Sequence, residues 1–417
     1  MEAEHMQVKG VGTMEDNLLD ESIPSIIAHY PETRDLFVNQ GFGELLESEV
    51  AGLIPLKSAL QVRGLNSDLF LEQVARERSG TGFSCGEPEQ VQEGDYGGLD
   101  LFASFPCPLK VPLEGALRTL LDGRHQAGRP LVSSLDGCNQ LRFNDVAGEV
   151  TDLAVLPDVI VSSGINSLLS HAFRRRFIDT GAFRRWPDRA VNPRLAGLGL
   201  DDPDGFYRVI AVNLFVFAVD KSRIGSLPVP RSWAELLNPL YAGTAAMCAH
   251  GEWFNESVLV ALHALYGDDG LKSLGRTVRY GMHPSQFAKH LGSGRPETPA
   301  LAIVPLFFAR TAKSQDDMEI VWPREGALAA PLFMLAKERS RERLADVTDF
   351  FDGAGVAHIC SGAFFPALHP QAPAVGSVNA PINWFGWQYL RDNDPEELRH
   401  RTLALFTAAH RAAHGTS

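Results

Sequence analysis

The sequence has few cysteines and no long apolar run. Its 417 residues include five cysteines at wide, irregular spacing, so neither a disulfide framework nor a paired-cysteine metal site is expected. No run of about 18 apolar residues is present, which argues against a membrane-spanning helix. Residues 1–22 lack the basic and apolar regions of a secretory signal. Together these absences predict a cytoplasmic protein without membrane insertion.

The common catalytic signatures are missing too. No GxSxG, Walker or GxGxxG motif stands in the strand–turn–helix setting that it requires, and HExxH is absent. These absences disfavour the familiar hydrolases, nucleotide triphosphatases and dehydrogenases. No catalytic residue and no cofactor is therefore assigned.

Charge divides the chain into two parts. The net charge is −13, and residues 1–100 hold 19 Asp and Glu against 6 Lys and Arg, whereas the remainder holds 32 of each. The chain also exceeds the length that one core normally supports. We therefore expect two units joined near residue 90. In chain order the expected parts are a disordered tail (1–15), a small helical domain (16–78), a linker rich in Gly and Glu (79–97) and an α/β domain (98–417).

Residues 16–78 predict a set of short helices. Ser22 caps an Ile-Pro start, and further helices are expected at Arg34–Gln40, Leu56–Val62 and Asn66–Arg76. The run IPSIIAHYPETRDLFVNQGFGEL resembles the small helical family DUF1858. Some members of that family carry a Cys pair after the glycine that matches Gly41, but this chain has none there. An acidic bundle that docks a protein partner is the alternative interpretation.

Residues 205–257 carry the main signal for the larger domain. The apolar run Phe206–Val219 predicts a long buried strand, and Thr244–Cys248 predicts a short one after a helix near Trp233. The series Phe206-Tyr207, Asn213, Asp220-Lys221, Pro230, Trp233, Leu236-Leu237, Pro239, Tyr241 and Gly243 resembles the type II, periplasmic-type solute-binding proteins of ABC transporters. The resemblance implies two α/β lobes with two crossovers. Lobe 1 is expected at about 98–217 and 323–417, and lobe 2 at about 218–322.

A solute-binding protein holds its ligand between the lobes, and open α/β sheets place such sites at the carboxyl ends of their strands. A strand at Leu99–Ser104, with a helix from about Pro112 to Leu121, brings Ser104 and Cys107 to this edge. The strand Leu156–Val161 ends in a Ser-Ser-Gly-Ile-Asn turn before a helix through Phe177, where the helix dipole favours an anion unless the polar side chains merely cap the helix. The expected ligand contacts are Ser104, Cys107, Ser162, Ser163, Asn166, Tyr207, His250, Glu252, Asn255, His283 and Phe307.

The expected function is non-catalytic binding of a small molecule or ion by a cytosolic carrier or sensor whose lobes close over the ligand. A metal site is the second interpretation, because iron carriers occur in the resembled family; His250, Glu252 and His283 are its candidate ligands, although the adjacent tyrosine pair of iron carriers is absent. A cytosolic enzyme is the third, with Cys107 or His250 as nucleophile or base. The acidic helical domain is the expected surface for a protein partner. Nucleic acid is not expected, because the chain has no basic surplus.

Overall fold

The structure is a computed structural model. It describes residues 18–37, 42, 46, 51–62, 71, 74, 96–137, 143, 147–250, 253–282, 287, 299–312, 317–375 and 380–415. The chain divides into two compact units, Met1–Glu89 and Gln90–Ser417, and the division falls inside the predicted linker. The predicted tail (1–15), Glu252, His283 and the side chain of His250 lie outside the described residues.

The described elements of the first unit are short helices, with one isolated β-bridge between Ser22 and Pro55. Its elements are η1 (Leu18–Asp20), α1 (Ile23–His29), η2 (Pro31–Thr33), α2 (Arg34–Phe37), η4 (Ala51–Leu53) and α4 (Leu56–Val62). The Ser22 hydroxyl accepts a hydrogen bond from the Ser25 N–H (3.4 Å), so Ser22 caps α1 as its position before Ile-Pro predicts. Ile23, Ile26, Phe37, Leu56 and Leu60 are fully buried and form a small apolar core.

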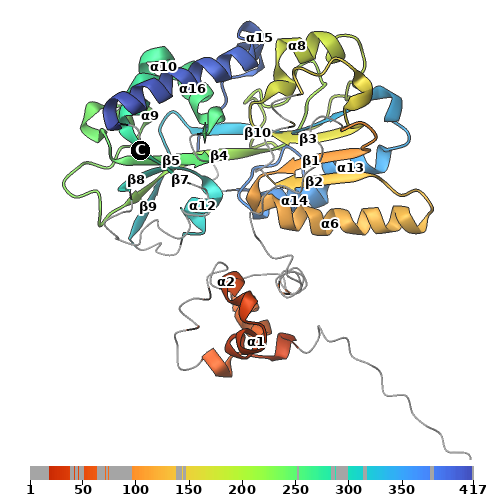
Figure 1. Ribbon diagram of the computed structural model, residues 1–417, viewed down its shortest axis with the longest axis horizontal. Coiled ribbons are helices and arrows are strands. Elements are labelled where there is room, and N and C mark those ends of the chain that lie inside the picture. The colour runs from red at the N-terminus through yellow and green to blue at the C-terminus, as the bar shows by residue number, and fades with distance from the viewer. Residues whose placement is uncertain are drawn as a thin grey trace, which may run out of the picture. The chain divides into compact units, whose positions relative to one another are not determined.

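The second unit is built on one mixed sheet (Figure 1). Its strands are β1 (Leu101–Phe105), β2 (Ser133–Gly137), β3 (Val159–Ser163), β4 (Arg208–Asp220), β5 (Ala245–His250), β6 (Trp253–Phe254), β7 (Val278–Met282), β8 (Leu301–Pro305), β9 (Met318–Val321), β10 (Ala327–Ala336) and β11 (Ile382–Asn383). The order is β2-β1-β3-β10-β4-β8-β5-β6, with β11 on β10, β7 on β5 and β9 on β4. Strands β2, β1 and β3 belong to lobe 1, and β8, β5 and β7 belong to lobe 2.

The two long strands β4 and β10 join the lobes, which confirms the predicted two-lobed α/β solute-binding fold. The first half of β4 pairs with β10, and its second half pairs with β8 and β9. In the same way β10 pairs with β3 of lobe 1 over Leu332–Ala336. Both crossing strands are almost entirely buried, because they are covered on both faces.

Helices cover both faces of this sheet. The helices that pack on the sheet in lobe 1 are α6 (Cys107–Gln126), α13 (Ala345–Asp352) and α14 (Ala354–Gly362). Those that pack on it in lobe 2 are α9 (Trp233–Leu236), α10 (Glu256–Thr277) and α16 (Pro395–His414) (Figure 1). The shorter elements are η5 (Leu153–Val155), η6 (Ser167–Leu169), α8 (His171–Phe173), the π-helical turn η7 (Arg174–Ile178), η8 (Pro239–Tyr241), α12 (Leu306–Arg310), η9 (Glu338–Ser340) and α15 (Trp387–Asp392). Among the described residues, none of the helices has the length and apolar character needed to cross a membrane.

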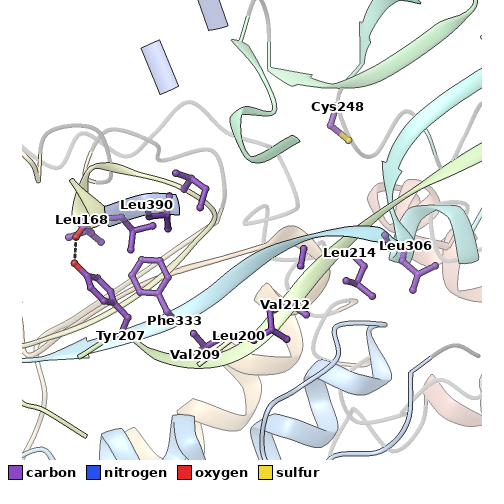
Figure 2. Close-up of a cluster of buried hydrophobic side chains, with 14 of the residues drawn as sticks. Leu168, Leu200, Tyr207, Val209, Val212, Leu214, Cys248, Leu306, Phe333 and Leu390 are labelled. Atoms are coloured by element: carbon purple, nitrogen blue, oxygen red, sulfur yellow. Dashed lines mark hydrogen bonds between the residues drawn. The ribbon is translucent and has the colours of Figure 1, made fainter. Parts of the chain in front are cut away.

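The side chains of β10 show how the cores are divided. Ala327, Ala329, Phe333 and Leu335 all enter one core that extends through both lobes. Figure 2 shows this shared core from Tyr207 and Phe333 to Leu306 and Cys248. The opposite face of β10 is split, because Leu332 and Met334 join the core of lobe 1 whereas Leu328 and Ala330 join that of lobe 2. The border between the lobes therefore lies at Pro331.

The last helix differs from our lobe assignment. Helix α16 falls in the range expected for lobe 1, but it packs along α10 of lobe 2. The rings of Phe254 and Phe406 lie 4.7 Å apart, and a Cβ at Gly275 would come within 2.7 Å of the Phe406 carbonyl oxygen. At its start, Asp394 lies 3.7 Å from His171 of lobe 1. Helix α16 can approach α10 this closely because residue 275 is a glycine, which has no Cβ. Residues 395–414 therefore belong to lobe 2 and not to lobe 1.

Candidate functional site

The strand directions place the polar strand ends of the two lobes opposite each other. Strand β10 is antiparallel to both β3 and β4, so β3 runs in the same direction as β4, from lobe 1 toward lobe 2. Strand β8 is antiparallel to β4, and β5 and β7 follow β8, so these strands run toward lobe 1. The carboxyl ends of β1 and β3 therefore face those of β5, β7 and β8. We call these facing ends the inter-lobe edge.

On the lobe 1 side, the turn after β3 is held by its own side chains. Ser162 is fully buried, and its hydroxyl accepts a hydrogen bond from the Asn166 amide (2.9 Å), so its predicted place among the ligand contacts is corrected. The same amide donates to the Ser163 carbonyl (3.2 Å), and Asn166 Oδ1 accepts from the Leu168 N–H (3.1 Å). Asn166 thus caps η6, as the capping interpretation predicts.

The predicted anion site at this turn needs correction. The expected helix through Phe177 is broken into the three-residue η6, the three-residue α8 and the π-helical turn η7, with Ser170 in an extended conformation between the first two. So short a helix has no appreciable dipole, because the dipole is the sum of aligned peptide units. The turn after β3 therefore offers hydrogen-bonding groups but no helix N-terminus for an anion.

Ser104 and Cys107 lie at the end of β1. Ser104 is the fourth residue of β1 and is buried, whereas Cys107 is partly exposed and begins α6. The predicted helix start near Pro112 is wrong by five residues, because Pro106 and Pro108 stand at the N-cap and in the first turn, where a missing N–H is tolerated. Cys107 therefore occupies the first position of a 20-residue helix at the inter-lobe edge.

On the lobe 2 side, β5 ends at His250 and returns through β6. Ala249 pairs with Phe254 and His250 with Trp253 in this hairpin. The next residue, Asn255, caps α10, because its Oδ1 accepts from the Val258 N–H (3.2 Å). Asn255, one of the expected ligand contacts, therefore lies at the inter-lobe edge.

The two sides of the edge touch each other directly. The Ile165 N–H, in the turn after β3, donates a hydrogen bond to Ser257 Oγ in the first turn of α10 (3.2 Å). Gly164 next to it has φ +77°, and a Cβ there would lie 3.0 Å from Ser257 Oγ. The structure thus brings the predicted Ser-Ser-Gly-Ile-Asn turn to the start of α10, next to Asn255. Sequence reasoning missed Ser257, and its only local signal is a hydroxyl two residues after an Asn cap.

Phe307 also reaches across the border. It lies in α12 directly after β8, and it packs against both the shared core and the core of lobe 1. Because it is only partly buried, part of its ring remains accessible at the edge. Its place among the ligand contacts stays a prediction.

Tyr207 lies elsewhere, which corrects its predicted place among the ligand contacts. It is buried, and its hydroxyl donates to the Leu168 carbonyl at 2.8 Å (Figure 2). Its ring stacks on that of Trp387, with 5.5 Å between the ring centroids. Burial raises the pKa of Tyr207 above its usual value, so the hydroxyl stays protonated. A small pocket beside it is lined by Leu169, His171, Arg174, Tyr207, Trp387, Leu390 and Arg391. The two guanidinium groups of this pocket, those of Arg174 and Arg391, both pair with Asp204, so their positive charges already have a counter-ion.

Metal-ligating groups do not gather in the described ranges. No set of three or more His, Cys, Asp or Glu side chains close enough to hold a metal ion occurs among the described residues. Cys360, in α14, is buried, and this burial raises the pKa of its thiol to about 12, so it is not a thiolate ligand. The metal interpretation with His250, Glu252 and His283 stays a prediction.

Comparison with known proteins bears on this arrangement. Residues 154–393 match the family model described as bacterial extracellular solute-binding protein. No curated protein sequence matches the chain. Among solved structures, the substrate binding protein of an ABC transporter from Agrobacterium tumefaciens gives a TM-score of 0.54 at 17% identity over 78% of this chain and 97% of that one.

Two further structures agree in fold. The apo ferric ion-binding protein A of Pasteurella haemolytica gives a TM-score of 0.52 at 12% identity over 75% of this chain and 98% of that one. An ABC transporter structure from Clostridium perfringens gives 0.50 at 13% identity over 74% and 99%. These likenesses show the fold, and the family model spans more than half of the chain. The protein belongs to the bacterial extracellular solute-binding protein family.

Proposed function

We propose that this protein binds a small molecule or ion between its two lobes and does not convert it. The observation that carries this proposal is the direct contact of the two lobes through Ile165 and Ser257, where their strand ends face each other. A solute that contacts both sides of this edge favours the closed arrangement of the lobes, because only differential affinity shifts such an equilibrium. The proposed contacts are Ser104, Cys107, Ser163, Asn166, His250, Glu252, Asn255, His283 and Phe307.

The absence of catalysis is part of this proposal. The described polar groups of the turn after β3 and the start of α10 are hydroxyls and amides that already hold backbone or side-chain partners, as at Ser162, Asn166 and Asn255. A nucleophile needs a neighbouring base to be activated, whereas the hydrogen bonds of Ser162, Asn166 and Asn255 join hydroxyl, amide and backbone groups. Binding accounts for these groups without a chemical step.

We further propose that the protein works inside the cell as a carrier or sensor, with a DUF1858-like first unit that docks a protein partner. The irregular cysteine spacing supports a reducing compartment, and the acidic surplus of residues 1–100 supports a basic partner surface. Fractionation of the source cells tests the location. Recovery from the periplasm or the medium would overturn it while leaving ligand binding intact.

Thermal denaturation of the full chain in the presence of candidate solutes is the direct test. A bound ligand stabilises the folded state by RT ln(1 + [L]/Kd), which is about 2.7 kcal/mol at 100 times Kd. Amino acids, polyamines, oxyanions, sugars and metal ions should be compared, and titration calorimetry should give one site per chain. Turnover of a stabilising compound would favour the enzyme interpretation instead.

Ferric iron belongs in this comparison, because a structural neighbour is named as a ferric ion-binding protein. Metal analysis of freshly purified protein gives an independent answer. One equivalent of iron per chain would move the proposal from organic solutes to metal binding.

A further inference from the structure

One residue of the crossing strand β4 breaks its apolar pattern. From Val209 to Asp220 every residue of β4 is buried except Asn213, which is partly exposed. Asparagine is among the residues that strands disfavour, and its neighbours Val212, Leu214 and Phe215 are all apolar and buried. A polar side chain at the centre of a buried strand needs either a structural partner or a function.

The strand pairings place Asn213 at the border between the lobes. Its partner in β10 is Ala330, next to Pro331. Lobe 1 ends close by, since the last residue of β3, Ser163, pairs with Leu332. Lobe 2 begins close by, since the last residue of β8, Pro305, pairs with Phe215. Asn213 therefore lies on the crossing strand between the two halves of the inter-lobe edge.

The alternation of side chains gives its direction. Val212 and Leu214 both enter the shared core, so Asn213 points to the opposite face of the sheet. That face is the divided one, where Leu332 belongs to the core of lobe 1 and Ala330 to the core of lobe 2. The Asn213 amide thus stands at the seam where the two apolar cores separate.

A structural role for this amide finds no support. Within the described part of the chain, the Asn213 side chain makes no hydrogen bond, although other asparagines of this unit are bonded. Asn192, for comparison, is buried, donates to the Ala367 carbonyl (3.1 Å) and accepts from the Arg194 N–H (3.1 Å). A polar group without a partner adds nothing to the folded state, so an apolar side chain would serve the strand better.

We propose that Asn213 contacts the bound solute from the crossing strand, and that this solute is a small organic molecule that presents hydroxyl, carbonyl or carboxyl oxygens. This inference rests on the proposed function. A carboxamide is neutral and both donates and accepts hydrogen bonds, which suits such groups better than a bare metal cation. Ser163, whose strand partner Leu332 lies on the same divided face, is also uncharged.

Two variants of the full chain separate this role from a structural one. Wild-type protein is first compared by thermal denaturation with sugars, polyols, amino acids and dicarboxylates. For a stabilising compound, Asn213→Leu should weaken binding at least tenfold in calorimetry, while its melting temperature without ligand stays equal to the wild type or rises. The matched control Asn192→Leu should melt lower and keep its affinity for the compound. If Asn213→Leu instead melts lower and binds normally, Asn213 is structural and the inference is wrong, although the proposed function stands.

If none of these compounds stabilises the wild type, that result counts against the proposed function and not against the inference about Asn213. A second measurement tests the inference in that case. Cysteine introduced as Asn213→Cys should react with iodoacetamide in the folded protein, with the modified site mapped by peptide mass spectrometry. Leu240→Cys, at a side chain 53% exposed, gives the accessible reference, and Val216→Cys, at a fully buried one, gives the inaccessible reference. Labelling of residue 213 within tenfold of the rate at residue 240 supports an accessible seam. A rate as low as that at residue 216 would overturn the inference.

Discussion

The two ends of strand β3 bury different kinds of polar group. At its amino end Asp158, only 8% exposed, lies 3.1 Å from the fully buried Lys337 and also pairs with Arg339 and Arg343. At its carboxyl end, side-chain hydrogen bonds within the Ser162–Asn166 turn and to Ser257 join uncharged groups. The charged end ties β3 to β10 inside lobe 1, whereas the uncharged end faces lobe 2.

This difference separates scaffold from site. A buried ion pair fixes one arrangement, because either charge left alone in the interior is strongly unfavourable. Neutral hydrogen bonds cost little to exchange with a solute or with water. The amino end of β3 is therefore suited to hold lobe 1 rigid, and the carboxyl end is suited to open and close.

Removing the charge at the amino end should have the largest effect. Asp158→Ala leaves Lys337 buried without its counter-ion, so we expect the free energy of unfolding of the second unit to fall by about 3–5 kcal/mol. All six tryptophans lie between Trp186 and Trp387, so urea denaturation followed by tryptophan fluorescence reports this unit alone.

An exposed ion pair provides the matched control. Asp269 pairs with Lys272 at 3.0 Å, but its side chain is 94% exposed. Asp269→Ala should therefore change the free energy of unfolding by less than about 1 kcal/mol. Equal losses in the two variants would remove the distinction between a scaffold end and a site end.

At the carboxyl end, Gly164→Ala should have the next largest effect. A left-handed φ of +77° costs an alanine about 1–2 kcal/mol, and the added Cβ at 3.0 Å from Ser257 Oγ adds about 1 kcal/mol of overpacking. Gly197→Ala is the control, because Gly197 has φ +83° but no atom within 4 Å of a Cβ. Denaturation should show a larger loss at position 164 than at 197. If the losses are equal, the contact between the lobes has no energetic weight.

Part of this molecule could be predicted from local sequence. Helix α4 has the bounds that its pattern predicts, Leu56–Val62, because a short amphipathic run is a local signal. The long apolar run of β4 is likewise sufficient to predict a buried crossing strand. Strand β2, Ser133–Gly137, was missed, because its Ser-Ser-Leu-Asp-Gly sequence carries no apolar alternation.

The contacts that define the site could not be predicted in this way. Ile165 and Ser257 are 92 residues apart, and Asp158 and Arg339 are 181 apart, so no local spacing links them. The burial of Tyr207 depends on Trp387, which follows it by 180 residues and begins helix α15, later in the chain than the second crossing strand. Long-range packing decides which polar groups are exposed, and the sequence pattern shows only which are present.

Acid should weaken the charged end selectively. Burial alone would raise the pKa of Asp158, but hydrogen bonds from Ser340, Arg339 and Lys337 outweigh it and lower this pKa from 3.8 to about 2. The unfolded chain therefore takes up the proton first as the pH falls. The stability that Asp158 provides is complete above pH ~4 and is mostly lost by pH ~2, which amounts to about 2 kcal/mol. The free energies of unfolding of the wild type and Asp158→Ala should be measured by denaturation at pH ~4 and pH ~2. The difference between the two proteins should shrink by about 2 kcal/mol at the lower pH, and a constant difference would contradict this prediction.

The smallest expected effect concerns the hydrogen bond that joins the lobes. Ser257→Ala removes the acceptor of the Ile165 N–H, which should cost about 0.5–1.5 kcal/mol and speed hydrogen exchange at Ile165 by about threefold to tenfold. Ser232→Ala removes a comparable bond inside lobe 2, where Ser232 Oγ accepts from the Glu235 N–H at 3.0 Å, so it should lower stability similarly without changing exchange at Ile165. If hydrogen exchange at Ile165 is unchanged in Ser257→Ala, this hydrogen bond does not limit how often the two lobes separate. The uncharged end of β3 would then lie open most of the time, and a solute would have to supply the whole of the closing free energy.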